Sequence, residues 1–428
     1  MRVGFVGPAA GLTGLCPLAG SELLISPTPT AYFGAGAAGR LPGVVRGVGG
    51  DAVVVVTDAA LAATGVVASI TAALAAAGMP VTVFSGVHPN PTTSDLADGA
   101  AAVRAAARAA RPGRPPAPAQ PGAPARPAPP SRARIALVAV GGGSAIDAAK
   151  GIALAAVNPQ RGRDLDYRGE FARPALPLVA VPTTAGTGAE TNAFGVVTDP
   201  QAGRKFYVGH ASALPAAAIL DPCLTLSLPP AATAATGLDA LVHALESFLS
   251  VRASPWSDGI ALQVIRMIAV HLPRACADGA DLEARAQMLL AAHMAGIGMA
   301  TTGLGLCHAI GHALGGRFGL AHGVALAAVL PHVLRFNAEA GPQRLAEVAF
   351  ALGAGSARRG AAGNAAAAIE AIAGLAGKVG LTPTLSGLGI TDGDFGQITA
   401  DALDDEVLAS TPRPPSAADI RSILDRAC

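Results

Sequence analysis

Three of the nine histidines in this 428-residue sequence lie close together in LGLCHAIGHALGGRFGLAHG, at His308, His312 and His322. Imidazole binds zinc and iron and also transfers protons, so the cluster indicates a metal centre or acid–base chemistry. Upstream, TGLDALVHALESF places Asp239 four residues before His243. If that segment is helical, both side chains share one face and can reach one ion. Such a pair alone more often forms a surface hydrogen bond, but the later histidines favour a site for Fe²⁺, Zn²⁺ or a similar cation.

A glycine-rich turn follows an apolar run in VAVGGGSAIDAAKGIAL, and a helix-like pattern begins directly after it. Glycines at the turn remove the side chains that would keep a ligand away from the backbone. The backbone N–H groups and the helix N-terminus can then approach a pyrophosphate closely. The sequence therefore predicts a phosphate-binding turn at Gly142, Gly143 and Ser144 rather than a plain tight turn.

FGAGAAG contains a second glycine pattern, GxGxxG, at Gly34, Gly36 and Gly39. In a chain with 53 glycines such a match arises easily by chance, and we give it little weight. Asp58, nineteen residues later at the end of an expected strand, is more informative. Its carboxylate is suited to accept hydrogen bonds from a ribose diol and to repel a 2′-phosphate. The alternative, that Asp58 caps the following helix, stays open.

Hydroxyl groups are dense in VPTTAGTGAET, where Thr183, Thr184 and Thr187 follow another expected strand. Ligands of open parallel sheets bind at this edge, beyond the carboxyl ends of the strands. We therefore interpret these threonines as part of a ligand site, although hydroxyls at such positions can also cap loops.

Apolar, β-branched runs alternate with helical stretches in the first half of the chain, at 52–58, 81–84, 135–140, 176–182 and 216–220. Continuous apolar strands separated by helices indicate a parallel sheet covered on both faces. From Pro229 onward only helical periodicity is found. We expect a Rossmann-like α/β dinucleotide-binding domain over residues 26–222, followed by an all-α metal-binding domain over residues 223–428. The length suits two domains.

Two segments fall outside this scheme. The run RPGRPPAPAQPGAPARPAPPSR, residues 111–132, is so rich in proline that neither a helix nor a sheet ladder can form. We interpret it as a disordered or extended surface insertion in the first domain. Residues 1–25 match no pattern and remain an unassigned leader.

Composition excludes several classes of partner. The formal net charge is only +1 and aromatic residues make up 4% of the chain, so a nucleic-acid partner is not expected. The five cysteines are scattered and form no CxxC pair, which is typical of reduced cytosolic thiols. The stretch 59–94 lacks charged residues, but Gly78 and Pro80 break it into a helix and a strand. We therefore expect a soluble, cytoplasmic protein that does not enter a membrane.

Four motifs, GGGSAIDAAK, PTTAGTGAE, GLDALVHALES and HAIGHALGGRFGLAHGVALAAVLPH, closely resemble the iron-containing (group III) alcohol dehydrogenase family and occur in its order. The resemblance extends from about Ser26 to STPRPPSAADI near the C-terminus. It implies a nucleotide-binding α/β domain and a helical domain with the active site in the cleft between them.

The resemblance also implies roles for individual residues. The metal ligands would be Asp239, His243, His308 and His322. His312 would face the nicotinamide and the substrate, where it relays a proton or shapes the pocket. The cofactor would contact Asp58, Asn90, Gly142, Gly143, Ser144, Asp147, Thr183, Thr184, Thr187 and Lys205. For Asp147 and Lys205 the alternatives are a carboxylate in the first turn of a helix and a solvated surface charge.

The activity implied by the resemblance is that of a metal-dependent alcohol dehydrogenase or aldehyde reductase. It would transfer a hydride between a small alcohol or hydroxyaldehyde and NAD, with NADP disfavoured by Asp58. Fe²⁺ is the expected ion and Zn²⁺ also suits the ligands. Family members generally form homodimers or larger assemblies.

Other activities of this architecture stay open. Maleylacetate reductases tend to lose the aspartate ligand, which is present here as Asp239. Dehydroquinate synthase needs a basic pocket that is not evident around these histidines. A non-catalytic protein that binds metal and nucleotide is the third alternative.

Overall fold

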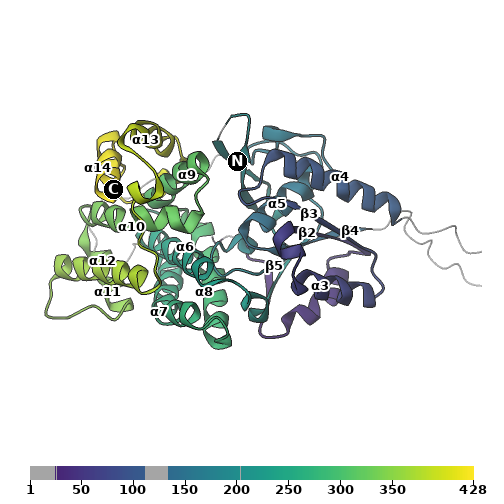
Figure 1. Ribbon diagram of the computed structural model, residues 1–428, viewed down its shortest axis with the longest axis horizontal. Helices are drawn as coiled ribbons and strands as arrows, with labels where there is room; N and C mark the ends of the chain where they lie inside the picture. Colours follow the sequence, from purple (N-terminus) through teal and green to yellow (C-terminus); the bar gives the residue numbers. More distant parts are fainter. Residues whose placement is uncertain (1–24, 26, 111–133, 203) are drawn as a thin grey trace, which may run out of the picture.

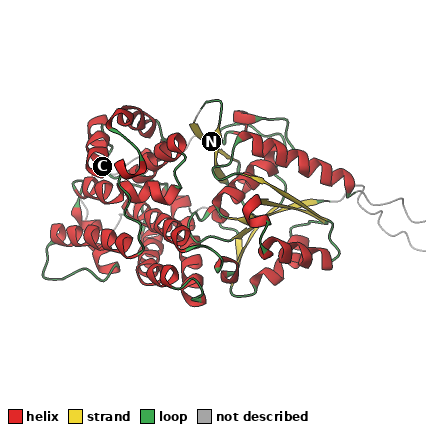
Figure 2. Ribbon diagram, in the orientation of Figure 1, coloured by secondary structure: helices red, strands yellow, loops and turns green. Residues whose placement is uncertain are grey.

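The computed structural model describes residues 25, 27–110, 134–202 and 204–428. Its N-terminal half contains a sheet with helices on both sides, and its C-terminal half is helical (Figures 1 and 2). Residues 1–24 and the proline-rich segment lie outside the described residues. The domain boundary after residue 222 stays a prediction, although the last strand ends at Leu220 and the first long helix begins at Pro230.

The main sheet has six parallel strands in the order β1-β8-β5-β4-β2-β3. Their bounds are β1 (Thr30–Phe33), β2 (Ala52–Asp58), β3 (Val81–Val87), β4 (Ile135–Gly141), β5 (Leu178–Pro182) and β8 (Ala217–Leu220). The five predicted apolar runs are confirmed as strands. Successive side chains of a strand point to opposite faces, so Val54 and Val56 join one core while Val53 and Val55 join the other. This is why the central strands are apolar throughout.

Helices cover both faces of the sheet (Figure 1). On one face lie α4 (Thr93–Ala109) and α5 (Gly143–Ala155), and on the other lie α1 (Leu41–Gly47) and α3 (Gly65–Ala76). An antiparallel hairpin, β6 (Phe194–Asp199) and β7 (Arg204–Gly209), packs against α5. The sequence analysis did not predict this hairpin.

The strand order places a switch point between β2 and β4. The chain leaves β2 for its neighbour β3 on one side, then crosses back to β4 on the other side of β2. In open parallel sheets, nucleotides bind in the crevice at such a point, beyond the carboxyl ends of the strands. Asp58 and Gly141 end these two strands. The topology thus brings the expected ribose carboxylate and phosphate turn to one crevice.

The C-terminal half is all-helical, as predicted. Its main helices are α6 (Pro230–Leu249), α7 (Pro255–Ala277), α8 (Leu282–Thr302), α9 (Leu306–Phe318), α10 (His322–Ala338), α11 (Pro342–Ala351), α12 (Ala361–Lys378), α13 (Phe395–Leu403) and α14 (Ala417–Ala427). α6 runs through their common core, with Leu241, Leu245 and Phe248 fully buried. Because neighbouring helices surround it, α6 can hold polar side chains in a buried, fixed position.

α7 is apolar and long enough to cross a membrane by length and composition alone, as is the bent pair of α8 and α9 taken together. Part of the apolar surface of α7 packs within the protein, whereas Val270 is 58% exposed. Val264, Ile265 and Ile268 are fully buried in the helical core. We therefore interpret α7 as a core helix.

Candidate active site

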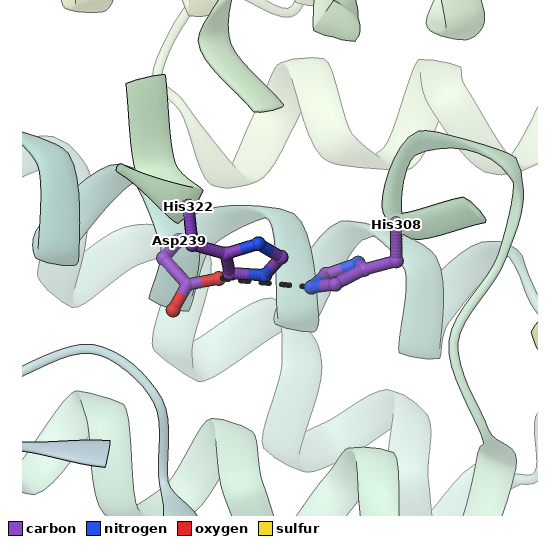
Figure 3. Close-up of side chains that lie close together, drawn as sticks. All are labelled: Asp239, His308 and His322. Carbon is purple, nitrogen blue, oxygen red and sulfur yellow. Dashed lines mark ion pairs between the residues drawn. The ribbon is translucent and has the colours of Figure 1, made fainter. Parts of the chain in front are cut away.

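Three helices of the C-terminal half bring the metal-binding candidates together. Asp239 and His243 lie one turn apart on the buried face of α6. His308 lies in the first turn of α9, and His322 is the first residue of α10. The predicted helical spacing of the Asp239 and His243 pair is therefore confirmed. Figure 3 shows Asp239, His308 and His322 directed toward one another, with the carboxylate of Asp239 beside the ring of His322 and a dashed line from it to His308.

One carboxylate oxygen is the centre of this cluster. Asp239 Oδ1 lies 3.4 Å from Nε2 of His243, and 3.6 Å from Nε2 of both His308 and His322. In a tetrahedral site with bonds of about 2.1 Å, neighbouring ligand atoms are roughly 3.4 Å apart. The ligand atoms of Asp239, His308 and His322 all lie within 4.8 Å of one another, and His243 is not part of this group of three. The separations match those of a shared ion.

The polar atoms of the cluster also lack other partners. Asp239 Oδ1 and His308 Nε2 are buried and form no hydrogen bond with any described residue. Leaving such atoms unpaired in the interior costs roughly 1–3 kcal/mol each, and more for a charged group. A divalent cation would satisfy both atoms at once. The donor set of one carboxylate and imidazoles therefore fits Fe²⁺ or Zn²⁺.

Electrostatics keep the cluster ready for a cation. Burial raises the pKa of Asp239, but His243, His322 and His308 outweigh it and hold this pKa well below the usual range. Burial lowers the pKa of His243 to about 4 and that of His322 well below its ordinary value, against the opposing effect of Asp239. At neutral pH the carboxylate is thus ionised, and both imidazoles are neutral with a free lone pair.

Glu246 orients the third imidazole. Its carboxylate accepts hydrogen bonds from the backbone N–H of Gly305 (2.8 Å) and Cys307 (2.7 Å) and contacts His308 Nδ1 at 2.6 Å. Burial disfavours the charged form of His308, but Glu246 and then Asp239 raise its pKa to about 9. With Nδ1 held by Glu246, Nε2 faces Asp239 and the site, an arrangement typical of metal-ligating histidines.

Sequence reasoning missed Glu246, although a signal was present. It lies three residues after His243 and seven after Asp239, so all three share one face of α6.

His312 lies beside the cluster without joining the group of three. Its ring stacks on that of His322, with centroids 5.4 Å apart. Its Nδ1 lies 2.7 Å from Oδ2 of Asp405, a residue that precedes the short helix η8 (Glu406–Ser410). Asp405 is 93 residues away in sequence and was not among the predicted site residues.

The predicted phosphate turn has the expected form. α5 begins at Gly143 directly after β4, so its N-terminus opens at the edge of the sheet. A Cβ atom on Gly143 would lie 2.6 Å from Thr187 Cγ2, and one on Gly142 would lie 3.2 Å from Thr184. Glycine is therefore required for the turn and the threonine loop to meet. Thr183 anchors that loop by donating its backbone N–H to the carbonyl of Gly141.

Two charged residues of the nucleotide half, Asp147 and Lys205, are held by polar partners. Asp147 accepts a hydrogen bond from Val196 N–H (3.0 Å) and lies 3.4 Å from Nζ of the fully buried Lys150. Lys205 donates to the side-chain oxygen of Asn90 at 3.0 Å. Burial raises the pKa of Asp147 and lowers that of Lys205, each against the attraction of nearby opposite charge. Lys205 is thus not the solvated surface charge of the alternative interpretation.

The two glycine patterns can now be told apart. In the GxGxxG segment, the backbone N–H groups of Gly36 and Ala38 donate to the carboxylate of Asp221 at 3.2 and 3.0 Å. That segment already binds an anion from its own chain. Asp58 does cap the following helix, because its Oδ1 accepts from Leu61 N–H at 2.8 Å. It also stands at the switch point, near Gly141.

A cavity of about 620 Å³ joins the two halves. Most predicted site residues line it: Asn90, Gly143, Ser144, Asp147, Thr187, Lys205, Asp239, His243, His308, His312 and His322. Four others do not: Asp58, Gly142, Thr183 and Thr184. The phosphate turn and the metal-binding cluster therefore open into one space, and a molecule bound there can touch both.

This combination of a parallel-sheet nucleotide site and a carboxylate–histidine cluster across one cleft defines a metal- and dinucleotide-dependent oxidoreductase. Comparison with known proteins gives the family. The model of the iron-containing alcohol dehydrogenases matches residues 27–109 and 132–222, and the model of the C-terminal part of the Fe-containing alcohol dehydrogenase family matches residues 233–428. The chain belongs to the iron-containing alcohol dehydrogenase family.

Individual relatives match over nearly their full length. The chain is 33% identical to an NAD-dependent methanol dehydrogenase of Bacillus methanolicus, over 93% of this chain and 98% of the relative. It is 34% identical to a lactaldehyde reductase of Escherichia coli, over 91% of this chain and 96% of the relative. A crystal structure of a 1,3-propanediol oxidoreductase superposes with a TM-score of 0.83 at 34% identity, covering 95% of this chain and 99% of that one. The expected fold, oxidoreductase class, NAD and iron are thus confirmed at the level of the family.

Replacing Glu246 with Gln should weaken metal binding about 10- to 100-fold, because His308 loses the carboxylate that orients it. Metal affinity is measured by competition with a chelator. Glu283→Gln, an exposed change at the start of α8, is the matched control and should leave affinity unchanged. Equal affinity in both variants would show that Glu246 does not support the metal site.

Replacing Gly143 with Ala should raise the Kd for NADH at least about tenfold, about 1.4 kcal/mol, because the new Cβ forces Thr187 away from the turn. NADH fluorescence titration gives the Kd. Gly39→Ala, in the other glycine pattern, has open space at its Cβ and should leave the Kd unchanged. A larger rise in the Kd for NADH at Gly39 than at Gly143 would place the phosphate site at the GxGxxG pattern.

Proposed function

We propose that this protein is a metal-dependent, NAD(H)-linked alcohol dehydrogenase and aldehyde reductase that acts on small alcohols or hydroxyaldehydes. The observation that carries the proposal is the shared cavity, which is lined by Gly143 and Ser144 on one side and by Asp239, His308 and His322 on the other. A nicotinamide reached from the phosphate turn and an alcohol oxygen at the cluster can meet there. The relatives named for methanol and lactaldehyde support small substrates.

Four side chains would hold the metal: Asp239, His243, His308 and His322. The ion they hold supplies Lewis-acid chemistry to the oxygen of an alcohol or a carbonyl. The residues themselves fix its place and keep it buried, with Glu246 orienting His308. His312, beside them on the cavity wall, would accept the hydroxyl proton at Nε2 during oxidation and return it during reduction.

The nucleotide half would orient NAD so that its nicotinamide reaches the cluster. Gly142, Gly143 and Ser144 would bind the pyrophosphate through backbone N–H groups, and the threonine loop at 183–187 would line the path toward the nicotinamide ribose. Asp58 would accept hydrogen bonds from the adenosine ribose. Asn90, Asp147 and Lys205, which line the same cavity, would also contact the cofactor.

The cellular setting is also part of the proposal. Cys223, Cys276, Cys307 and Cys428 are free thiols, which suits the reducing cytoplasm. We propose a cytoplasmic enzyme that works on a small-molecule substrate as a homodimer or larger homo-oligomer. The presence of Asp239 favours an alcohol dehydrogenase over a maleylacetate-reductase-like enzyme.

Metal removal should abolish NAD(H)-linked turnover of small alcohols and aldehydes, and reloading with Fe²⁺ or Zn²⁺ should restore it. His308→Ala should lose both metal and turnover while its Kd for NADH stays within about twofold, because His308 belongs to α9 of the helical half and not to the phosphate turn. Absorbance of NADH and metal analysis provide the two readouts. Full activity in a metal-free His308→Ala protein would contradict the proposal.

Asp58→Ser should relax the preference for NAD over NADP. Serine keeps the helix cap but removes the charge, and repulsion between two unit charges at about 4 Å is worth about 1 kcal/mol even in water, a factor of about five. The ratio of kcat/KM for NADP to that for NAD is the measurement, and the Tm should not change. An unchanged ratio would mean that Asp58 only caps α2.

A further inference from the structure

The two ring nitrogens of His312 lie in different surroundings: Nδ1 contacts Asp405, whereas the ring itself lines the cavity. His312 lines the cavity, whereas Asp405 does not. The Nδ1 edge faces Asp405 Oδ2 at 2.7 Å, and both side chains are only about one-tenth exposed, at 12% and 11%. Among the described residues Nε2 has no hydrogen-bond partner. The imidazole therefore offers Nε2 to whatever occupies the cavity.

The second oxygen of Asp405 is fixed from two sides. Oδ1 accepts a hydrogen bond from Val407 N–H at 3.1 Å and from the Tyr207 hydroxyl at 3.4 Å. Tyr207 comes from β7 in the nucleotide half, and its ring meets that of His312 edge-on with centroids 6.3 Å apart. The carboxylate thus contacts a strand of the nucleotide half and the α9 helix of the metal half. It cannot rotate without breaking bonds to both.

We propose that Asp405 is a positioning residue for the reaction: it holds the ring proton of His312 on Nδ1 and so presents Nε2 to the substrate hydroxyl as a hydrogen-bond acceptor. An ionised carboxylate can only accept, so the nitrogen facing it must donate. Tyr207 fixes the carboxylate from the opposite half. This inference rests on the proposed function, because it assigns the partner of Nε2 as the alcohol that is oxidised.

The proposed oxidation removes one hydride and one proton from the alcohol. Bound NAD⁺ would be the oxidant: as the carbinol C–H bond breaks, it would take up that hydrogen with its electron pair, and the alcohol would become a carbonyl. The O–H bond breaks at the same stage, and its proton passes to Nε2 of His312. The resulting imidazolium keeps its hydrogen bond to Asp405 and then gives a proton to water. Carbonyl reduction runs the same steps in reverse.

Asp405→Asn tests the proton position without changing the shape of the side chain. Val407 N–H needs an acceptor, so the amide oxygen of the new Asn should stay on that side. Its NH₂ group would then face Nδ1 of His312 and donate to it. Nδ1 becomes an acceptor, and the proton moves to Nε2, where it blocks acceptance from an alcohol. The variant therefore inverts the hydrogen-bonding role of His312 within an intact fold.

The experiment uses the full chain, labelled with ¹⁵N-histidine and loaded with Zn²⁺. Long-range ¹H–¹⁵N spectra report which ring nitrogen carries the proton, and His312→Gln identifies the His312 signals by their loss. Wild type should show the proton on Nδ1 and Asp405→Asn should show it on Nε2. The kcat for alcohol oxidation should fall about 10²-fold in Asp405→Asn, while zinc content and the Kd for NADH stay unchanged. Asp98→Asn, an exposed change on α4, is the control and should match wild type.

A wild-type spectrum with the proton on Nε2 of His312 would overturn the proposal by itself, even if Asp405→Asn did not fold or load zinc. Wild-type kcat in Asp405→Asn would overturn it too. Loss of zinc from a folded Asp405→Asn protein would also overturn the proposal, because Asp405 would then act on the metal site and not on the proton of His312. The spectra do not depend on turnover. A wild-type protein with the predicted proton position but no NAD(H)-linked activity would therefore refute the proposed function and, with it, the alcohol as the partner of Nε2.

Discussion

The structure depends on the compensation of one buried negative charge, the carboxylate of Asp239. A charged group in the interior is costly unless it is paired, and a cation shared by Asp239 and the three imidazole nitrogens around its Oδ1 would supply that pairing. Close packing of the helices brings the histidines within reach of Asp239. A Cβ atom on Gly323 would lie 2.0 Å from the carbonyl oxygen of Ala235, so only glycine lets the start of α10 approach α6 closely enough for His322 to reach Asp239.

The same close packing joins the metal half to the nucleotide half. A Cβ atom on Gly188 would lie 2.6 Å from Gly296 Cα, so the loop after β5 rests directly on α8. Next to this contact, Glu190 and His293 form a buried pair at 3.0 Å. These contacts fix the threonine loop relative to the metal cluster. Hydride transfer requires two carbons to be aligned closely, and rigid contact between the halves provides that alignment.

Local patterns in the sequence predicted much of this arrangement. Uninterrupted apolar runs gave the parallel strands, glycines after a strand gave the phosphate turn, and the four-residue spacing placed Asp239 and His243 on one helix face. Resemblance to the family supplied the remaining candidate ligands and the proposed role of His312. Glu246 was also within reach, because it continues the face defined by its two neighbours.

The features that could not be predicted from the sequence depend on contacts between distant segments. Asp405 lies 93 residues from His312 and 198 from Tyr207, and no local pattern links them. The GxGxxG pattern looks like a nucleotide site until Asp221, about 185 residues away, is seen to occupy its N–H groups. A sequence motif specifies which atoms are present, whereas the fold decides which of them are still available.

The most direct test of this account is the position of iron in crystals of the iron-loaded protein, found by anomalous scattering at the iron edge. The account predicts one strong peak about 2.0–2.2 Å from Asp239 Oδ1 and from the Nε2 atoms of His243, His308 and His322, with His312 outside the coordination sphere. A peak bound by other residues, or none at this cluster in fully loaded protein, would contradict it.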